Sequence, residues 1–298
     1  ASRSPTTAQA FAAEWGIPRA HGSYQALLDD PGVDAVYVPL PNHLHAEWSV
    51  RAAHAGKHVL CEKPLALSVA ECDRIMAAAF SAGVVVVEAV MYLYHPLLQQ
   101  VRQMVQEGAL GQVTLVRGSF TFVLDRPDDV RWTPEWGGGS LWDVGLYPVS
   151  FSRWVAGEAA QVFGWQVLSE SGVDDTFAGL LTFPGEVLGL FDCGYRQPYR
   201  TWVEVTGTGG TLTIERPFNI NPETRVVLRQ GPGKVTDVPV PGDDPYRCEV
   251  DAVAAAALDG APLPVPLGYS RANVATLVAL YESARQGTPQ RIEGLSCR

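Results

Sequence analysis

The stretch His58-Val59-Leu60-Cys61-Glu62-Lys63-Pro64 reads as a short strand that ends in Glu-Lys-Pro. Pro64 stops the strand, and because the residue before a proline is pushed out of the helical region, Lys63 is expected to be extended. In an open parallel sheet, ligands bind at the carboxyl ends of the strands. A lysine there can bind a phosphate, pair with an acid or take part in proton transfer. A surface ion pair at the strand end is the alternative.

Helical and strand patterns alternate around this stretch. Helices are predicted over 5–15, 23–29, 43–55 and 68–82, and strands over 34–38, 58–62 and 84–88. Ser68 and Glu71 form a capping box for the last of these helices. Strands separated by helices predict a doubly wound parallel sheet. Residues 1–95 are therefore predicted to form a Rossmann-like α/β domain.

The pattern changes near residue 96. After a helix over 96–107, consecutive strand patterns predict a largely antiparallel, open sheet, and helices over 245–258 and 270–286 close the chain. These strands are predicted over 113–122, 162–168, 176–183, 187–193, 202–206, 211–215 and 225–229. Residues 96–298 should form an α+β domain whose sheet packs one face on helices and offers the other for a homodimer.

Composition excludes several classes of protein. The chain has 298 residues, a net charge of −10 and 47% hydrophobic residues, which argues against a nucleic-acid or anionic membrane partner. No apolar run reaches the roughly 20 residues of a membrane span. The five cysteines (61, 72, 193, 248 and 297) are widely spaced, which predicts reduced thiols in a cytoplasmic protein.

Two motifs have ordinary explanations. Gly207-Thr208-Gly209-Gly210 is followed by a strand and not by a helix, so a hairpin turn is favoured over a phosphate loop. His43 and His45 lack the further ligands that a zinc site needs, so no metal is predicted.

The second informative stretch is Gly137-Gly138-Gly139-Ser140-Leu141-Trp142-Asp143-Val144-Gly145-Leu146-Tyr147-Pro148. Ser140 and Asp143 are expected to cap a helix in which Asp143 and Tyr147, at i and i+4, share one face. Pro148 predicts a kink beside Tyr147. A plain helix cap with a half-buried tyrosine is the alternative, and exposed surface contacts are the alternative for Arg131-Trp132 and for Ser2-Arg3-Ser4.

Together these stretches resemble the Gfo/Idh/MocA family of nicotinamide-dependent oxidoreductases. The matching features are Pro39-Leu40-Pro41-Asn42-His43-Leu44-His45, the strand into Glu62-Lys63-Pro64, and the glycines leading to Asp143-x-Gly145-x-Tyr147-Pro148. The resemblance covers essentially the whole chain. Tyr147 places it nearest the dihydrodiol dehydrogenase, D-xylose dehydrogenase and glucose-fructose oxidoreductase branch.

The resemblance implies the roles of the site residues. Lys63 and Tyr147 would be catalytic, and Asp143 and Trp132 would contact a sugar or polyol substrate. The cofactor would be bound by Ser2, Arg3, Pro39, Leu40, Asn42, His45, Glu62, Pro64 and Arg131. The Lys63–Pro64 bond is often cis in relatives. Hydride transfer from a CH–OH group also requires removal of the hydroxyl proton, and Lys63 would lower the pKa of Tyr147 for that task.

The family's opening strand and Gly-x-Gly-x-x-Gly loop have no counterpart in the sequence, so an N-terminally incomplete chain is expected. Ser2-Arg3-Ser4 would follow the second strand, where an arginine suits the 2′-phosphate of NADP; NAD is the alternative. The predicted function is therefore hydride transfer between NADP(H) and the CH–OH or C=O group of a sugar or cyclic diol. A non-catalytic ligand-binding relative is the other hypothesis.

Overall fold

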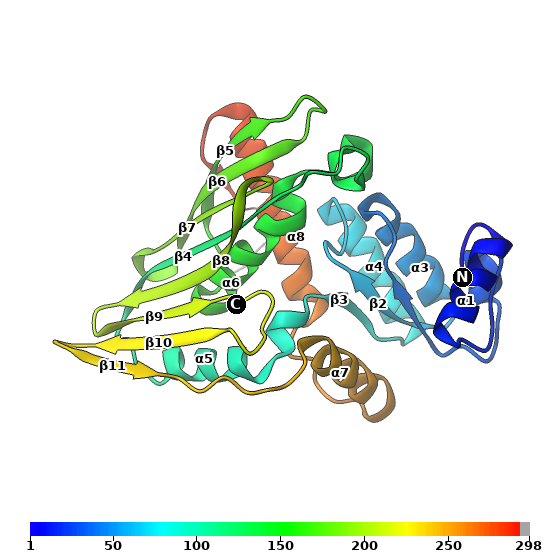
Figure 1. Cartoon of the computed structure of the whole chain (residues 1–298), viewed down its shortest axis with the longest axis horizontal. Coiled ribbons are helices and arrows are strands. Elements are labelled where there is room, and N and C mark those ends of the chain that lie inside the picture. Colours follow the sequence, from blue (N-terminus) through cyan, green and yellow to red (C-terminus); the bar gives the residue numbers. More distant parts are fainter. Residues whose placement is uncertain (293–298) are drawn as a thin grey trace.

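The computed structural model describes residues 1–292, and its strands form two sheets that lie side by side (Figure 1). The first sheet is parallel and has three strands in the order β1-β2-β3. The second has nine strands in the order β11-β10-β9-β8-β4-β7-β6-β5-β12. The predicted α/β class, a Rossmann-like parallel sheet followed by a largely antiparallel one, is confirmed.

The parallel sheet is built as the sequence pattern predicts. Its strands are β1 (Ala35–Val38), β2 (His58–Glu62) and β3 (Val86–Ala89), connected by helices α3 (His45–His54) and α4 (Val69–Ala82). Ser68 caps α4 by accepting from the Glu71 N–H, and Gly83 ends that helix in the left-handed conformation. All four residues of β3 are buried, whereas the two flanking valines predicted as strand, at 84 and 85, lie outside it.

Two helices precede β1. α1 (Pro5–Trp15) is capped by Ser4, and the short α2 (Tyr24–Leu28) is capped by Ser23. Both helices lie at the β1 end of the sheet, on the right in Figure 1. The rings of Phe11 and Trp15 on α1 are exposed at this end.

The nine-stranded sheet is antiparallel except at one pair, because β4 runs parallel to β7. The Gly207–Gly210 turn joins β8 to β9 as a tight hairpin, as predicted. The strands are β4 (Val113–Val123), β5 (Gln161–Leu168), β6 (Asp174–Phe183), β7 (Val187–Gly194), β8 (Arg196–Gly207), β9 (Gly210–Glu215), β10 (Arg225–Gln230), β11 (Lys234–Asp237) and β12 (Gln290–Arg291).

Helices cover one face of this sheet and connect it to the parallel sheet (Figure 1). α6 packs on β4, and α8 packs on β5 as well as on α4 and β3. α7 contacts the 3-10 turn η2 (Met91–Tyr94) that follows β3. The helices of this half of the chain are α5 (Pro96–Gln106), α6 (Leu146–Ala156), α7 (Pro245–Asp259) and α8 (Leu267–Gln286), of which α6 and α8 pack on the sheet. Within residues 1–292, no helix is long and apolar enough to cross a membrane.

Candidate active site

Lys63 is positioned by the end of β2 and by the loop after β1. The Lys63–Pro64 peptide bond is cis. His45 is fully buried, and its two ring nitrogens lie within hydrogen-bond distance of the carbonyl oxygens of Pro64 (Nδ1, 2.7 Å) and Leu40 (Nε2, 2.6 Å). The imidazole therefore joins the β1 loop to the β2 loop. Glu62 lies beside Lys63 and accepts a hydrogen bond from the Tyr37 hydroxyl (2.5 Å).

Asp143 comes from the other side of the site, on a π-helical turn (Leu141–Gly145) that runs directly into α6. The prediction that Ser140 caps a helix here is wrong. The Ser140 hydroxyl and the Leu141 N–H both donate to the buried Asp174 of β6 (2.7 and 2.8 Å), so a carboxylate on the sheet holds the start of the turn. Because π turns insert an extra residue, they often occur at functional sites.

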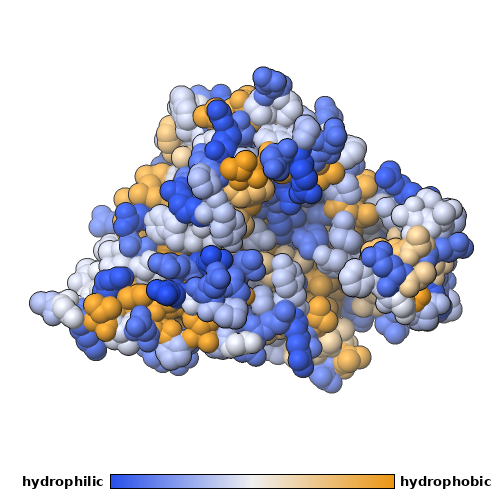
Figure 2. All heavy atoms as spheres, viewed as in Figure 1, coloured by the Kyte–Doolittle hydropathy of each residue, from blue (hydrophilic) through white to orange (hydrophobic). Residues whose placement is uncertain are grey.

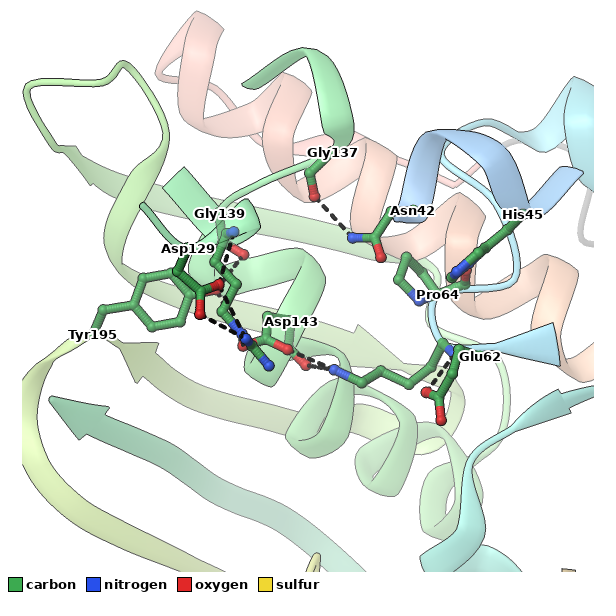
Figure 3. Close-up of polar contacts among 11 residues, drawn as sticks. Asn42, His45, Glu62, Pro64, Asp129, Gly137, Gly139, Asp143 and Tyr195 are labelled. Carbon is green, nitrogen blue, oxygen red and sulfur yellow. Dashed lines mark hydrogen bonds and ion pairs between the residues drawn. The ribbon is translucent and has the colours of Figure 1, made fainter. Parts of the chain in front are cut away.

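Lys63, Asp143 and Arg131 form one charged cluster (Figure 3). Lys63 Nζ donates to Asp143 Oδ1 (2.6 Å) and to the Asp143 carbonyl oxygen (2.8 Å). Arg131 Nε donates to Asp143 Oδ2 (2.6 Å), where the Tyr195 hydroxyl also donates (3.2 Å). Burial would raise the pKa of Asp143, but the charges of Lys63 and Arg131 outweigh it, so Asp143 stays ionised.

Tyr147 lies on the first turn of α6 with its ring packed against Phe120 and Phe218. Lys63 Nζ is 5.4 Å from the centre of that ring. Burial, with the charge of Asp143 next, raises the pKa of Tyr147 well above its ordinary value. The prediction that Lys63 lowers this pKa is therefore wrong, because burial and the negative charge of Asp143 both raise it.

Two adjoining cavities share the charged cluster as a common wall. A cavity of about 260 Å³ is lined by Lys63, Asp143 and Tyr147 together with Phe120 and Glu249. A second, of about 280 Å³, extends from the same cluster along the loops 39–42 and 137–139. On the face shown in Figure 2, the surface between the two halves of the molecule is recessed. The geometry therefore places the charged cluster and Tyr147 beside a second cavity at the carboxyl ends of β1 and β2.

Comparison with known families agrees with this geometry. Residues 1–90 match the family described as "Oxidoreductase family, NAD-binding Rossmann fold", and residues 98–213 match the "GFO/IDH/MocA C-terminal domain". The chain belongs to the Gfo/Idh/MocA family of oxidoreductases.

Several family members resemble the chain over most of its length. D-xylose 1-dehydrogenase (NADP(+)) 2 of Haloferax volcanii is 38% identical over 98% of this chain and 91% of its own. Trans-1,2-dihydrobenzene-1,2-diol dehydrogenase of Mus musculus is 33% identical over 72% of this chain and 65% of its own. A 3-ketoreductase from Actinomadura kijaniata, solved with NADP and TDP-benzene, superposes with a TM-score of 0.88 at 30% identity, covering 95% of this chain and 88% of its own.

The residues that the Gfo/Idh/MocA resemblance assigns to the cofactor fall into two groups. Those in the second cavity lie together along the loops described above, and Asn42 donates to the Gly137 carbonyl oxygen across that cavity (2.9 Å, Figure 3). They are Pro39, Leu40, Asn42, His45, Glu62 and Arg131, while Pro64 lies behind them on His45. Ser2 instead lines an apolar groove of about 480 Å³ beside β1, and Arg3 is exposed.

Trp132 lies outside the lining of both cavities. Its indole N–H donates to the Arg126 carbonyl oxygen (3.0 Å), and its ring packs edge-on against Tyr195. Trp136, which the sequence pattern did not single out, lines the second cavity instead.

Tyr195 and Glu249 are further site residues that sequence reasoning missed. Tyr195 follows β7 and has no local motif. Glu249 does have a signal, because it shares the inward face of α7 with Val253 and Ala256 at helical spacing. A carboxyl on such a stripe marks a position where packing alone would favour an apolar residue.

The residues present fit the nicotinamide end of a dinucleotide. The second cavity lies at the carboxyl ends of parallel strands, where such ligands bind, and it shares Lys63, Arg131 and Asp143 with the cavity that Tyr147 lines. Among residues 1–292, no glycine-rich loop leads from a strand of the parallel sheet into a helix, so the fit concerns this end only. The same residues contain no group of three His, Cys, Asp or Glu side chains placed to hold a metal ion.

Proposed function

We propose that the protein is an NADP(H)-dependent oxidoreductase that transfers a hydride between the cofactor and the CH–OH or C=O group of a sugar or cyclic diol. The observation that carries this proposal is the cavity in which Lys63, Asp143 and Tyr147 converge from the two halves of the chain. The named activities of the xylose dehydrogenase and the dihydrodiol dehydrogenase support the substrate class.

Tyr147 is the proton donor in carbonyl reduction. Its raised pKa keeps the phenol protonated near neutral pH, so it can give its proton to the carbonyl oxygen as the carbon is reduced. Lys63 is held by Asp143 within reach of the Tyr147 ring, and its ammonium group stabilises the negative charge that develops on the oxygen and the phenol. When bound, the cofactor supplies or accepts the hydride.

Two features support NADP over NAD. Arg3 is exposed near the β1 end of the parallel sheet, where the 2′-phosphate of NADP would be expected. The similar xylose dehydrogenase carries NADP(+) in its name, and the similar ketoreductase was solved with NADP. Ser2 and Arg3 are proposed to contact that phosphate.

The assembly is proposed to be a homodimer formed through the nine-stranded sheet. Phe163, Leu180 and Leu190 lie in one row across β5, β6 and β7, and Trp165, one step along, is 62% exposed. A row of this kind is typical of sheet-to-sheet association. The cytoplasm is the proposed location, because four thiols (61, 72, 193 and 248) are free; Cys297 lies outside the described residues.

The test is turnover with purified protein. NADP+ or NAD+ reduction is followed at 340 nm with D-xylose, other aldoses and a trans-dihydrodiol, alongside a fluorescence titration with NADPH. Substrate-dependent NADP+ reduction with a lower KM for NADP+ than for NAD+ is expected. Cofactor binding without turnover of any sugar or diol would favour a non-catalytic ligand-binding role.

A further inference from the structure

Glu249 is a second carboxyl group in the wall of the reacting cavity. It comes from α7, a helix that returns from the nine-stranded sheet to contact η2 behind β3. Its residue surface is only 3% exposed, and it lines the same 260 Å³ cavity as Lys63 and Tyr147. Its neighbours on the inward face of α7 are apolar. The carboxyl group is therefore delivered to the cavity and not to solvent.

Nothing in the described part of the chain satisfies this carboxyl group. Glu249 Oε1 is buried without a hydrogen-bond partner among residues 1–292, and Glu249 enters none of the ion pairs found there. The nearby cations Lys63 and Arg131 both bond Asp143 instead. A buried carboxyl group without a partner lowers stability, so folding alone gives no reason for a glutamate here.

The groups that act on the charge of Glu249 are themselves acidic. Burial and then the charges of Glu62 and Glu88 raise the pKa of Glu249 to about 8. The group is therefore largely protonated near neutral pH, with one O–H donor and free acceptor capacity. A hydroxyl group matches this set, because it can accept from the acid and donate to its carbonyl oxygen. A carboxylate or phosphate at the same point would face Glu62 in the cavity wall, while the two cations of that wall, Lys63 and Arg131, are already paired with Asp143.

We infer that Glu249 is a substrate-binding residue that pairs with a hydroxyl group next to the reacting carbon and selects neutral polyhydroxylated substrates. The inference rests on the proposed function of the Lys63–Tyr147 cavity and adds a specificity determinant to it. A site built to hydrogen-bond a substrate hydroxyl discriminates strongly against the deoxy compound, because the buried polar group of the site is then left unpaired. Glu249 is thus expected to distinguish polyols from their deoxy analogues.

The test compares Glu249→Leu and Glu249→Gln with the wild type. The control is Asp251→Asn, which removes a charge from the exposed side of the same helix. Each protein is assayed for kcat and KM with the best sugar of the substrate panel and with its monodeoxy analogues, and its melting temperature is recorded. Glu249→Leu is expected to lose about tenfold or more in kcat/KM, mainly through KM. Glu249→Gln, which can still donate and accept, is expected to lose much less.

The decisive pattern is non-additivity. One deoxy analogue should have a much lower kcat/KM than the parent sugar with the wild type. In Glu249→Leu, the loss of kcat/KM caused by that missing hydroxyl should disappear. The melting temperature of Glu249→Leu should equal or exceed that of the wild type, because the unpaired carboxyl group is gone. Equal deoxy penalties in both proteins, or a fall in melting temperature that parallels the loss of activity, would overturn the inference.

Failure of the proposed function would look different. If the wild type turns over no sugar or diol, the rise in melting temperature that D-xylose causes in the presence of NADP+ decides the inference by binding alone. A rise in the wild type that is lost in Glu249→Leu supports the role of Glu249 without catalysis. The same rise in both proteins, or no rise in either, overturns it.

Discussion

The positions and pKa values of individual side chains in this site depend on partners that are distant in the sequence. Lys63 and Tyr147 are 84 positions apart in number, yet Asp143 brings the lysine to within 5.4 Å of the tyrosine ring. The Lys63 ammonium group pairs with the Asp143 carboxylate, and burial is the main influence that raises the pKa of Tyr147. This balance supports the proposal that Tyr147 donates a proton in the reductive direction.

Glu88 gives a prediction about stability and pH. Burial raises its pKa from 4.5 to about 7, while its Oε1 accepts from the Leu65 N–H (2.8 Å). Between these pH values the folded protein holds a proton that the unfolded chain has lost, so this stabilising contribution is lost progressively as the pH rises from about 4.5 to about 7. The shift corresponds to about 3 kcal/mol in the free energy of unfolding.

The wild type is accordingly expected to melt at a lower temperature at about pH 8 than at about pH 6. Glu88→Gln keeps an acceptor for Leu65 but does not titrate, so its melting temperature should fall less over the same interval. Differential scanning fluorimetry at both pH values measures the two differences. Identical pH dependence in the two proteins would show that Glu88 does not take up the proton.

At the scale of the element, the π-helical turn before α6 depends on a glycine. Gly139 has φ +117°, and a Cβ there would lie 2.2 Å from Asp174 Oδ1 and 2.8 Å from the Tyr281 hydroxyl. These are the groups that fix the start of the turn, because Asp174 accepts from Ser140, Leu141 and Tyr281. Asp143 and Tyr147 both follow on this turn and the helix after it.

Gly139→Ala is therefore expected to lower stability by about 2–4 kcal/mol, from backbone strain and overpacking together, and to reduce kcat/KM more than tenfold. Gly157→Ala is the matched control, because Gly157 also has a positive φ (+86°) but has no atom within 4 Å of the added Cβ. Chemical denaturation and steady-state kinetics measure both effects. Equal losses in the two variants would mean that the contact with Asp174 is unimportant.

Much of this level of structure could be predicted from the sequence. Capping residues such as Ser68, turn glycines and the period of the apolar residues placed most helices and strands, because these signals are local. The interactions of Asp174 were not predictable. They join β6 to the residues before α6, and no local pattern reports which distant carboxylate a backbone N–H meets. The π turn and the parallel pairing of β4 with β7 were missed for the same reason.

The site residues also divide into those that local motifs reveal and those that depend on distant contacts. Lys63, Asp143 and Tyr147 were predicted from two motifs, and the structure brings them together. Trp132 was predicted to contact substrate but packs on Tyr195, because its indole N–H is taken by a carbonyl of its own loop. Glu249 was missed, although its position on the apolar face of α7 is visible in the sequence.

At the scale of the whole molecule, the uncovered face of the nine-stranded sheet predicts self-association. Trp165→Arg, placed in the exposed apolar row of β5, is expected to convert a dimer to a monomer. Leu258→Arg is the control, since Leu258 is 83% exposed on α7, away from this sheet. Size-exclusion chromatography with light scattering gives the mass of each protein. A dimer that persists in Trp165→Arg would place the interface elsewhere.

Tyr147→Phe tests most directly whether Tyr147 moves the proton that accompanies hydride transfer. The substitution removes only the hydroxyl group and keeps the ring packed against Phe120 and Phe218. The measurement is kcat for the best carbonyl substrate with NADPH, together with the Kd for NADPH of both proteins. We expect kcat to fall to less than about a tenth of the wild-type value, a loss of more than about 1.4 kcal/mol of transition-state stabilisation, with the Kd nearly unchanged. A variant that keeps more than a tenth of the wild-type kcat would contradict the assignment.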